Sequence, residues 1–209
     1  HWLVDKGDRK DRKYPFANKV YFSAICRNNG LAASRVVAIC GGGSRVHFTE
    51  GATEFPPVDL FVKIKNGRGG RGAEKWSYVD GSYRNSSGRS LTEKEFQQYL
   101  ARRSRIEKRI VQYCLVNHSS LADINLGALA TARILTLRNE EGGIEATHAV
   151  LRMPQRPGAS VDNIHAGGIA APIDLKTGTL GRATDLGLRP RSRWHERHPG
   201  RRELFGWHG

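Results

Sequence analysis

The feature that most constrains the fold is a glycine-rich loop between two extended segments, residues 60–65 (LFVKIK) and 73–79 (AEKWSYV). The loop has a G-x-G-x-x-G spacing with one further glycine inside it, at Gly67, Gly69, Gly70 and Gly72. A dinucleotide-binding fold needs a helix directly after such a loop, and a P-loop needs Lys followed by Ser or Thr, neither of which the sequence indicates. The pattern instead predicts a strand, a loop and a returning strand.

The segment before the loop carries two lysines at alternate positions, Lys63 and Lys65. Alternate residues of a strand point to the same side of a sheet, so we expect both ammonium groups on one face and Val62 and Ile64 on the other. Glycines without side-chain bulk allow backbone N–H groups to approach phosphate oxygens beside these cations. The alternative is an exposed hairpin with a flexible tip and ordinary surface lysines.

Charge indicates an anionic partner, because 34 Lys and Arg outnumber 20 Asp and Glu for a formal net charge of +14. Nucleotide, acidic substrate, nucleic acid and membrane surface all satisfy this requirement. No apolar run approaches the roughly 20 residues that cross a bilayer, so we predict neither a membrane span nor a signal peptide. Cys26, Cys40 and Cys114 form no C-x-x-C pair, which argues against a disulfide framework or zinc site and favours a reducing cytoplasm.

The remaining patterns predict a mixture of helices and antiparallel strands. A helix is expected from Pro15, in first helical position, to a stop at Asn29-Gly30, and a second after a capping box at Ser90-Leu91-Thr92-Glu93. Strands are expected at residues 35–40, 45–48 and 108–115, as a hairpin at 128–137 and 145–153, and at 169–175. Turns are expected at residues 41–44, 140–143 and 176–178. Residues 1–13 and the basic tail 182–202 receive no element.

The segment VDNIHAGG places Asp162, Asn163 and His165 before Gly167-Gly168. Polar side chains beside paired glycines suggest close approach of the backbone to a ligand, with Asn163 donating to a phosphate oxygen and His165 donating or accepting. The alternative is an Asx-type turn with an incidental histidine.

Two arginines, Arg133 and Arg152, lie on the two strands of the predicted hairpin among apolar neighbours. Burying an unpaired guanidinium is costly, so each either reaches outward to solvent or meets an anion. We expect the anion.

Together these segments resemble the ATP-grasp superfamily, and most closely its sugar-transfer-associated branch. The resemblance runs from about Pro15 to the end, in the order FANKVYFSAICRNNGL, DLFVKIKNGRGGRGAEKW, IVQYCLVNH, GALATARILTL, THAVLRMP and VDNIHAGGIAAPIDLKTGTLG. It implies an α+β fold of two lobes with an antiparallel sheet and a glycine-rich flap. We expect a charged remnant at residues 1–14, an N-lobe at 15–116 and a partial, C-terminally truncated C-lobe at 117–209, with ATP between the lobes.

The resemblance also implies roles for individual residues. Lys63 is similar to the lysine that holds the α- and β-phosphates, with Lys65 beside it, and Gly67 to Gly72 are similar to the flap. The strand that receives adenine would be Gln112 to Leu115, including Cys114. Arg133 and Arg152 resemble the arginines that steady the γ-phosphate and acyl phosphate, and Asn163 and His165 resemble the polar loop at the reacting centre.

The implied reaction is attack of a small-molecule carboxylate on the γ-phosphate of ATP, followed by displacement of phosphate by an amine or similar nucleophile, with Mg²⁺ neutralising charge. The family holds its magnesium with an acid on one late strand and a Glu-x-Asn pair on the next, and nothing after Val161 matches that spacing. We therefore assign no metal ligand and expect those strands beyond Gly209, with Asp162 or Asp174 as substitutes the sequence leaves open. The sugar-transfer association suggests exopolysaccharide or cell-envelope metabolism.

Two other functions compete with this interpretation. A basic nucleic-acid-binding module would use the arginines of the tail, at positions 182, 189, 191, 193, 197, 201 and 202, but the tail lacks interleaved aromatic residues for stacking. A phosphotransferase would use the same strand and loop cradle, but the chain has no H-R-D or D-F-G motif. We therefore expect an enzyme with no nucleic-acid partner.

Overall fold

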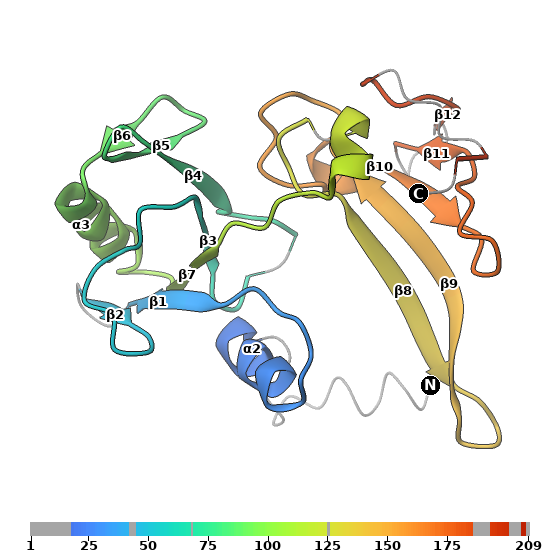
Figure 1. The fold of residues 1–209 in the computed structure, drawn as a ribbon, viewed down its shortest axis with the longest axis horizontal. Helices are drawn as coiled ribbons and strands as arrows, with labels where there is room; N and C mark the ends of the chain where they lie inside the picture. The colour runs from blue at the N-terminus through green and yellow to red at the C-terminus, as the bar shows by residue number, and fades with distance from the viewer. Residues whose placement is uncertain are drawn as a thin grey trace. The chain divides into compact units, whose positions relative to one another are not determined.

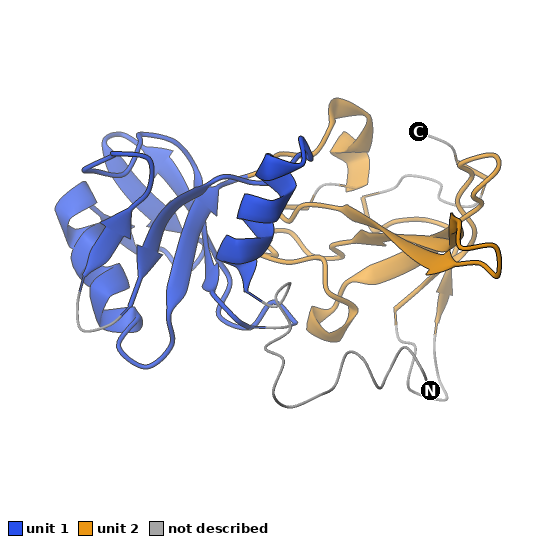
Figure 2. Ribbon diagram, turned by 90° about the horizontal axis from the view of Figure 1, so that it is seen from below, with its two compact units in different colours: residues 1–114 blue, residues 115–209 orange. Residues whose placement is uncertain are grey.

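The structure is a computed structural model that describes residues 18–41, 45–67, 69–124, 126–185, 193–200 and 206–207. The chain divides into two compact units, residues 1–114 and 115–209 (Figure 2). The predicted charged remnant at residues 1–14 lies outside the described residues. Each unit contains its own antiparallel sheet, and the predicted α+β class is confirmed.

Unit 1 is a seven-stranded sheet in the order β2-β1-β7-β3-β4-β5-β6 (Figure 1). Its strands are β1 (Val36–Cys40), β2 (Val46–Phe48), β3 (Leu60–Ile64), β4 (Glu74–Val79), β5 (Ser82–Asn85), β6 (Ser90–Leu91) and β7 (Arg109–Tyr113). The predicted strands at 35–40, 45–48, 60–65 and 108–115 are confirmed with slightly shorter bounds. Most of the predicted turn at 41–44 falls on residues 42–44, which lie outside the described part.

The first described helix, α2 (Lys19–Asn28), confirms the predicted helix and its stop. The side-chain oxygen of Asn18 accepts from the backbone N–H groups of Val20 and Tyr21, at 3.2 and 3.4 Å. Such an N-cap satisfies donors that have no partner inside the helix. After the last turn, Gly30 has a φ of 67° and ends the helix. The helix begins at Lys19, and Pro15 lies outside the described residues.

The second helix, α3 (Glu93–Arg103), starts later than the predicted capping box implies. Its N-cap is Thr92, whose hydroxyl accepts from the Glu95 N–H, while the Glu95 carboxylate accepts from the Thr92 N–H at 2.9 Å. Ser90 and Leu91 pair with β5 instead. The predicted helix is therefore confirmed, and the predicted box at residues 90–93 is wrong by two residues.

The core of unit 1 lies between the sheet and α3 and is rich in aromatic side chains. Phe96 of α3 stacks on Tyr83 with ring centroids 4.6 Å apart and tilts against Trp76 at 4.9 Å. All three side chains are fully buried, together with Leu60 and Leu100. These contacts pack one face of the sheet against α3.

Unit 2 contains a five-stranded sheet in the order β12-β11-β10-β9-β8. Its elements are η2 (Ser119–Ile124), β8 (Thr131–Arg138), β9 (Ile144–Met153), η3 (Ile164–Ala166), β10 (Ile169–Ile173), β11 (Ala183–Thr184) and β12 (Trp194–His195). The hairpin β8–β9, the strand β10 and the turns after β8 and β10 are confirmed. Its buried core includes Ile124, Leu151, Met153, Ile169 and Leu180.

Part of the basic tail is folded into unit 2, which the sequence did not predict. The strands β11 and β12 pair with each other, and β11 pairs with β10. His198 is 2% exposed, with one ring nitrogen 2.7 Å from the Pro154 carbonyl oxygen and the other accepting from the Gly200 N–H at 3.0 Å. Burial is the main cause that lowers the pKa of His198. This described part of the tail is therefore structural. Among the described residues, no helix is long and apolar enough to cross a membrane.

Candidate functional site

Lys63 lies on the face of the unit 1 sheet opposite the aromatic core. Lys63 pairs with Ile110 of β7, and Phe61 pairs with Gln112, so these four side chains share that face. Lys63 is half-buried, and no carboxylate of the described residues forms an ion pair with it. Burial, and secondly the charge of Lys19, lowers its pKa to about 8. Among the described residues, this cation therefore has no anion of the kind that such burial usually requires.

A cation that the sequence did not predict, Lys19, lies near Lys63, and its charge contributes to the lowered pKa of Lys63. Lys65 follows the last residue of β3, Ile64, and its N–H donates to the Lys108 carbonyl at 2.8 Å, so its place beside Lys63 stays a prediction. Lys19 extends from the first turn of α2, and its Nζ donates to the carbonyl oxygens of Lys65 at 3.2 Å and Gly67 at 2.7 Å. Desolvation lowers the pKa of Lys19 as well.

The glycine loop joins two antiparallel strands, as predicted: Leu60 of β3 pairs with Trp76 of β4. Gly69, Gly70 and Gly72 all have positive φ, at 65°, 74° and 65°, which glycine adopts without strain. At Gly67, a Cβ would come within 2.8 Å of the Ile64 Cβ, so glycine is also required there by the protein's own packing. Arg68, inside the loop, lies outside the described residues.

The predicted adenine strand is the C-terminal half of β7 and the residues after it. Gln112 is 5% exposed; its amide nitrogen donates to the Ser34 carbonyl at 2.7 Å, and its amide oxygen is buried with no partner among the described residues. Such an orphaned acceptor is costly unless a ligand or water donates to it. The Cys114 N–H already donates to the Asp59 carbonyl at 3.0 Å, and Leu115 is the first residue of unit 2 and is exposed.

In unit 2, Arg152 of β9 is 8% exposed and meets an anion of the protein itself. Its guanidinium pairs with the Asp162 carboxylate at 3.0 Å and donates to the Asn163 side-chain oxygen at 3.2 Å. Asp162 also accepts from the Thr131 hydroxyl. Burial is the main cause that lowers the pKa of Arg152, while Asp162 opposes the shift. The structure thus brings Arg152 and Asn163 together, and Asp162 supplies an anion the sequence had assigned to a ligand.

Arg133 and His165 are placed less tightly. Arg133 of β8 is exposed and pairs with Val150, on the same face of the hairpin as Arg152. Its charge contributes to the lowered pKa of Arg152. His165 is exposed on η3.

The glycine pair after η3 has a local role. Gly167 caps η3 in the left-handed conformation, with φ at 90°. At Gly168, a Cβ would lie 2.3 Å from the Asp162 carbonyl oxygen and 3.0 Å from that of Met153. The sequence predicted that the backbone of this segment approaches a ligand closely, whereas the structure shows a close approach between two parts of the chain. This approach positions Asp162 and Asn163 beside β9.

Sequence reasoning missed two cations beside the glycine loop, Lys19 and Arg109. Lys19 carried a weak signal, because a cation in the first turn of a helix opposes the helix dipole and suggests another role. Arg109 is buried and its guanidinium donates to the Gly72 carbonyl at 2.9 Å. Arg109 was missed because the apolar pattern of residues 108–115 predicted only a strand.

The donors present fit a nucleotide better than a metal ion. A half-buried ammonium without a carboxylate partner and a loop of glycines suit a polyphosphate. Across the residues that the structure describes, no group of three His, Cys, Asp or Glu side chains could hold a metal. The half-buried carboxylate of Asp162, near the hairpin, already interacts with Arg152 and Thr131. These residues do not fit Mg²⁺.

The geometry agrees with a comparison against protein families. The model of the family described as sugar-transfer associated ATP-grasp matches residues 6–205. The comparisons with curated proteins and with solved structures gave no match. Because the family match covers nearly the whole chain, this chain belongs to the sugar-transfer associated ATP-grasp family.

Proposed function

We propose that the protein is an ATP-dependent ligase that activates a carboxylate as an acyl phosphate for attack by an amine or similar nucleophile. Family membership supports the use of ATP. The observation that carries the proposal is Lys63: a half-buried ammonium beside a glycine loop, with no carboxylate partner in the described part of the chain and with a second cation, Lys19, next to it. A polyphosphate would supply the missing negative charge.

Unit 1 would bind the nucleotide. Lys63 would contact the α- and β-phosphates, with the loop glycines Gly67, Gly69, Gly70 and Gly72 allowing close backbone approach. In this proposal Lys65 adds a further positive charge next to the loop. The orphaned side-chain oxygen of Gln112 suits the exocyclic amine of adenine, near the backbone of Cys114 and Leu115. Unit 1 would then correspond to the N-lobe of the family, and unit 2 to its C-lobe.

Unit 2 would act on the transferred group. Arg133, which is exposed, would hold the γ-phosphate and then the acyl phosphate, with Arg152 supporting the same face. Asn163 and His165 would orient the carboxylate and the nucleophile. Mg²⁺ would neutralise phosphate charge; the described residues supply no group of three His, Cys, Asp or Glu side chains for it. We further propose a cytoplasmic setting, since all three cysteines are free thiols, and a role in exopolysaccharide or cell-envelope metabolism.

Trapping with hydroxylamine tests this proposal. The full-length enzyme is incubated with ATP, Mg²⁺, hydroxylamine and a panel of sugar acids and amino acids, and hydroxamate and ADP are measured. An acyl phosphate reacts with hydroxylamine, so one acid in the panel should give hydroxamate in equal amount to ADP. A stable phosphoester without hydroxamate would instead identify a phosphotransferase, and salt-dependent binding of nucleic acid with neither product would support the nucleic-acid-binding module.

A further inference from the structure

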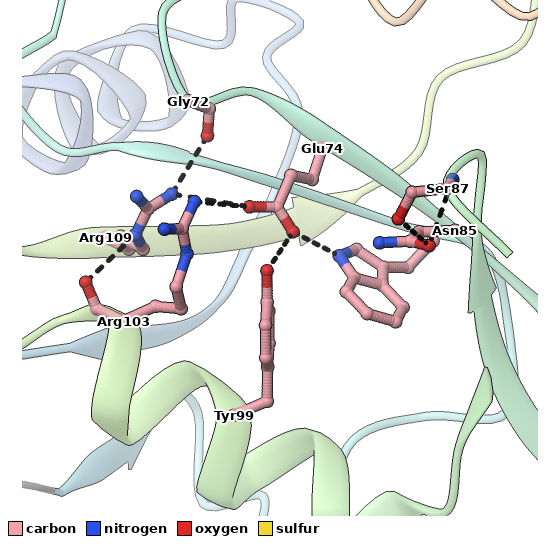
Figure 3. A network of polar contacts seen from close by, with 8 residues as sticks. Gly72, Glu74, Asn85, Ser87, Tyr99, Arg103 and Arg109 are labelled. Carbon is pink, nitrogen blue, oxygen red and sulfur yellow. Dashed lines mark hydrogen bonds and ion pairs between the residues drawn. The ribbon is translucent and has the colours of Figure 1, made fainter. Parts of the chain in front are cut away.

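The C-terminal end of the glycine loop is held by the buried guanidinium of Arg109 (Figure 3). Its Nη1 donates to the Gly72 carbonyl at 2.9 Å, and its Nε donates to the Arg103 carbonyl at 3.4 Å. Arg109 therefore joins the loop to the end of α3, an element fixed in the aromatic core. Because the loop contact uses a backbone carbonyl, it restrains the path of the chain.

Glu74, two residues after Gly72, fixes the surroundings of Arg109. Its carboxylate accepts from the Tyr99 hydroxyl at 2.8 Å and the Trp76 indole at 3.1 Å, and it pairs with Arg103 at 3.3 Å (Figure 3). The guanidinium of Arg109 lies 3.9 Å from the same carboxylate. Two of the three ions, Glu74 and Arg109, are thus largely buried and partnered, which makes the arrangement rigid.

The N-terminal end of the loop is held in the same way by Lys19. Its ammonium donates to the carbonyl oxygens of Lys65 and Gly67, so a cation grips the backbone there too. Between the two ends, Gly67 and Gly72 both rest on the Ile64 side chain, where an added Cβ would lie 2.8 and 3.1 Å from Ile64 carbon atoms. Two cations and one apolar support therefore fix the loop ends to different parts of unit 1.

We propose that Arg109 and Lys19 are positioning residues that hold both ends of the glycine loop in place before nucleotide binds. This inference rests on the proposed function, in which the loop contacts phosphate. Because the ends are already held, less conformational entropy is lost when nucleotide orders the loop. Arg109 and Lys19 with their contacts to the loop, here called the clamp, therefore raise nucleotide affinity. Arg109 can hold the loop end in this way without contacting the nucleotide.

Arg109→Gln, with Arg103→Gln as matched control, tests the C-terminal end. Both changes remove one positive charge beside Glu74, but only Arg109 donates to Gly72. Hydrogen–deuterium exchange of peptides covering residues 66–73 is measured without nucleotide, and affinity is measured with the ATP analogue adenosine 5′-(β,γ-imido)triphosphate. Loss of one buried hydrogen bond corresponds to about a fivefold change, so Arg109→Gln should raise loop exchange and weaken binding by roughly that factor, and Arg103→Gln by much less.

Arg109→Lys keeps the charge and a donor, so its loop exchange should fall between wild type and Arg109→Gln. If Arg109→Gln does not fold, the loop exchange of Arg109→Lys is compared with that of the wild type instead. Uniform exchange increases across β1, β5 and the loop would show general destabilisation and overturn the inference, as would equal loop exchange in the Arg109 and Arg103 variants. A wild-type protein that does not bind the analogue would overturn the proposed function, while the exchange result without nucleotide would still decide whether Arg109 holds the loop.

Lys19→Gln tests the other end, with Arg27→Gln as its control on the same helix. Arg27 pairs with Glu50 on the exposed side of α2, so both variants lose one charge from α2. Lys19→Gln should raise the exchange of the loop peptide, and Arg27→Gln should leave it at the wild-type level. Equal exchange in both variants would remove Lys19 from the clamp.

Discussion

At the scale of single residues, Arg152 and Lys63 differ in whether a carboxylate of the described residues compensates their burial. Arg152 has a carboxylate partner in Asp162, so the cost of removing its charge from water is offset within the chain. Lys63 has no such partner among the described residues, and its lowered pKa reports the remaining cost. A cost that the protein does not offset is one that a ligand can remove. This difference makes Lys63 the stronger candidate for direct contact with an anionic ligand.

The lowered pKa of Lys63 predicts how stability depends on pH. The unfolded lysine keeps its proton up to its ordinary pKa of 10.5, whereas the folded one loses it near pH 8. Between these values the unfolded state binds more protons, so the wild type should gain stability relative to Lys63→Gln as pH rises from 7 to 10. We expect a relative gain of about 1 kcal/mol after discounting for solvent screening, measured by urea unfolding at both pH values. A constant or shrinking difference would contradict the assignment.

Removing the partner of Arg152 should cost more than breaking an exposed pair. Asp162→Asn keeps the size of the side chain but leaves the guanidinium buried without an anion, and we expect a loss of about 2–3 kcal/mol. Glu196→Gln breaks the exposed pair with Arg182 and should cost about 0–1 kcal/mol. Urea unfolding of both variants at pH 7 measures the two losses, and similar small values would show that Asp162 does not compensate Arg152.

At the scale of elements, α3 shows why a local pattern can be found while its register is missed. The pattern of Ser or Thr followed three residues later by Glu fits both Ser90 with Glu93 and Thr92 with Glu95. The structure uses the second, because Ser90 pairs with β5, and Glu93 instead accepts from the Phe55 N–H at 3.2 Å and from the Gln97 side chain at 2.7 Å. Strand pairing therefore decides which of two equivalent caps forms.

The two registers of this cap make different predictions for mutants. Thr92→Ala removes the acceptor for the Glu95 N–H and should lower the free energy of unfolding by about 1 kcal/mol. Ser90→Ala changes an exposed position of β6 and should cost only a few tenths of a kcal/mol. Thermal or urea unfolding of the pair decides between them; the larger loss at Ser90 would restore the predicted box.

At the scale of the whole molecule, most of the longer strands were predictable, and so was the loop between β3 and β4. Both depend on local alternation and on turn residues. The hairpin β8–β9 and the loop around Gly70 are examples. The contacts of Lys19 and Arg109 with the loop were not, because they join residues 48 and 37 positions apart in the sequence. The order of strands in the sheet, with β7 between β1 and β3, decides which of these side chains meet. The strands β5, β6, β11 and β12 were missed because β5 has four residues, the other three have two each, and none has a clear apolar pattern.

Nucleotide binding by Lys63→Ala, with Lys94→Ala as its control, tests the proposed phosphate site at Lys63 and the glycine loop. Lys94 is exposed on α3, which packs on the opposite face of the same sheet. Isothermal titration with adenosine 5′-(β,γ-imido)triphosphate should show at least a tenfold weaker affinity for Lys63→Ala, since a charge-assisted contact contributes about 1.5–3 kcal/mol, and an unchanged affinity for Lys94→Ala. Circular dichroism should show both variants folded. An affinity for Lys63→Ala equal to that of the wild type would contradict the assignment of Lys63 and the glycine loop as the phosphate site.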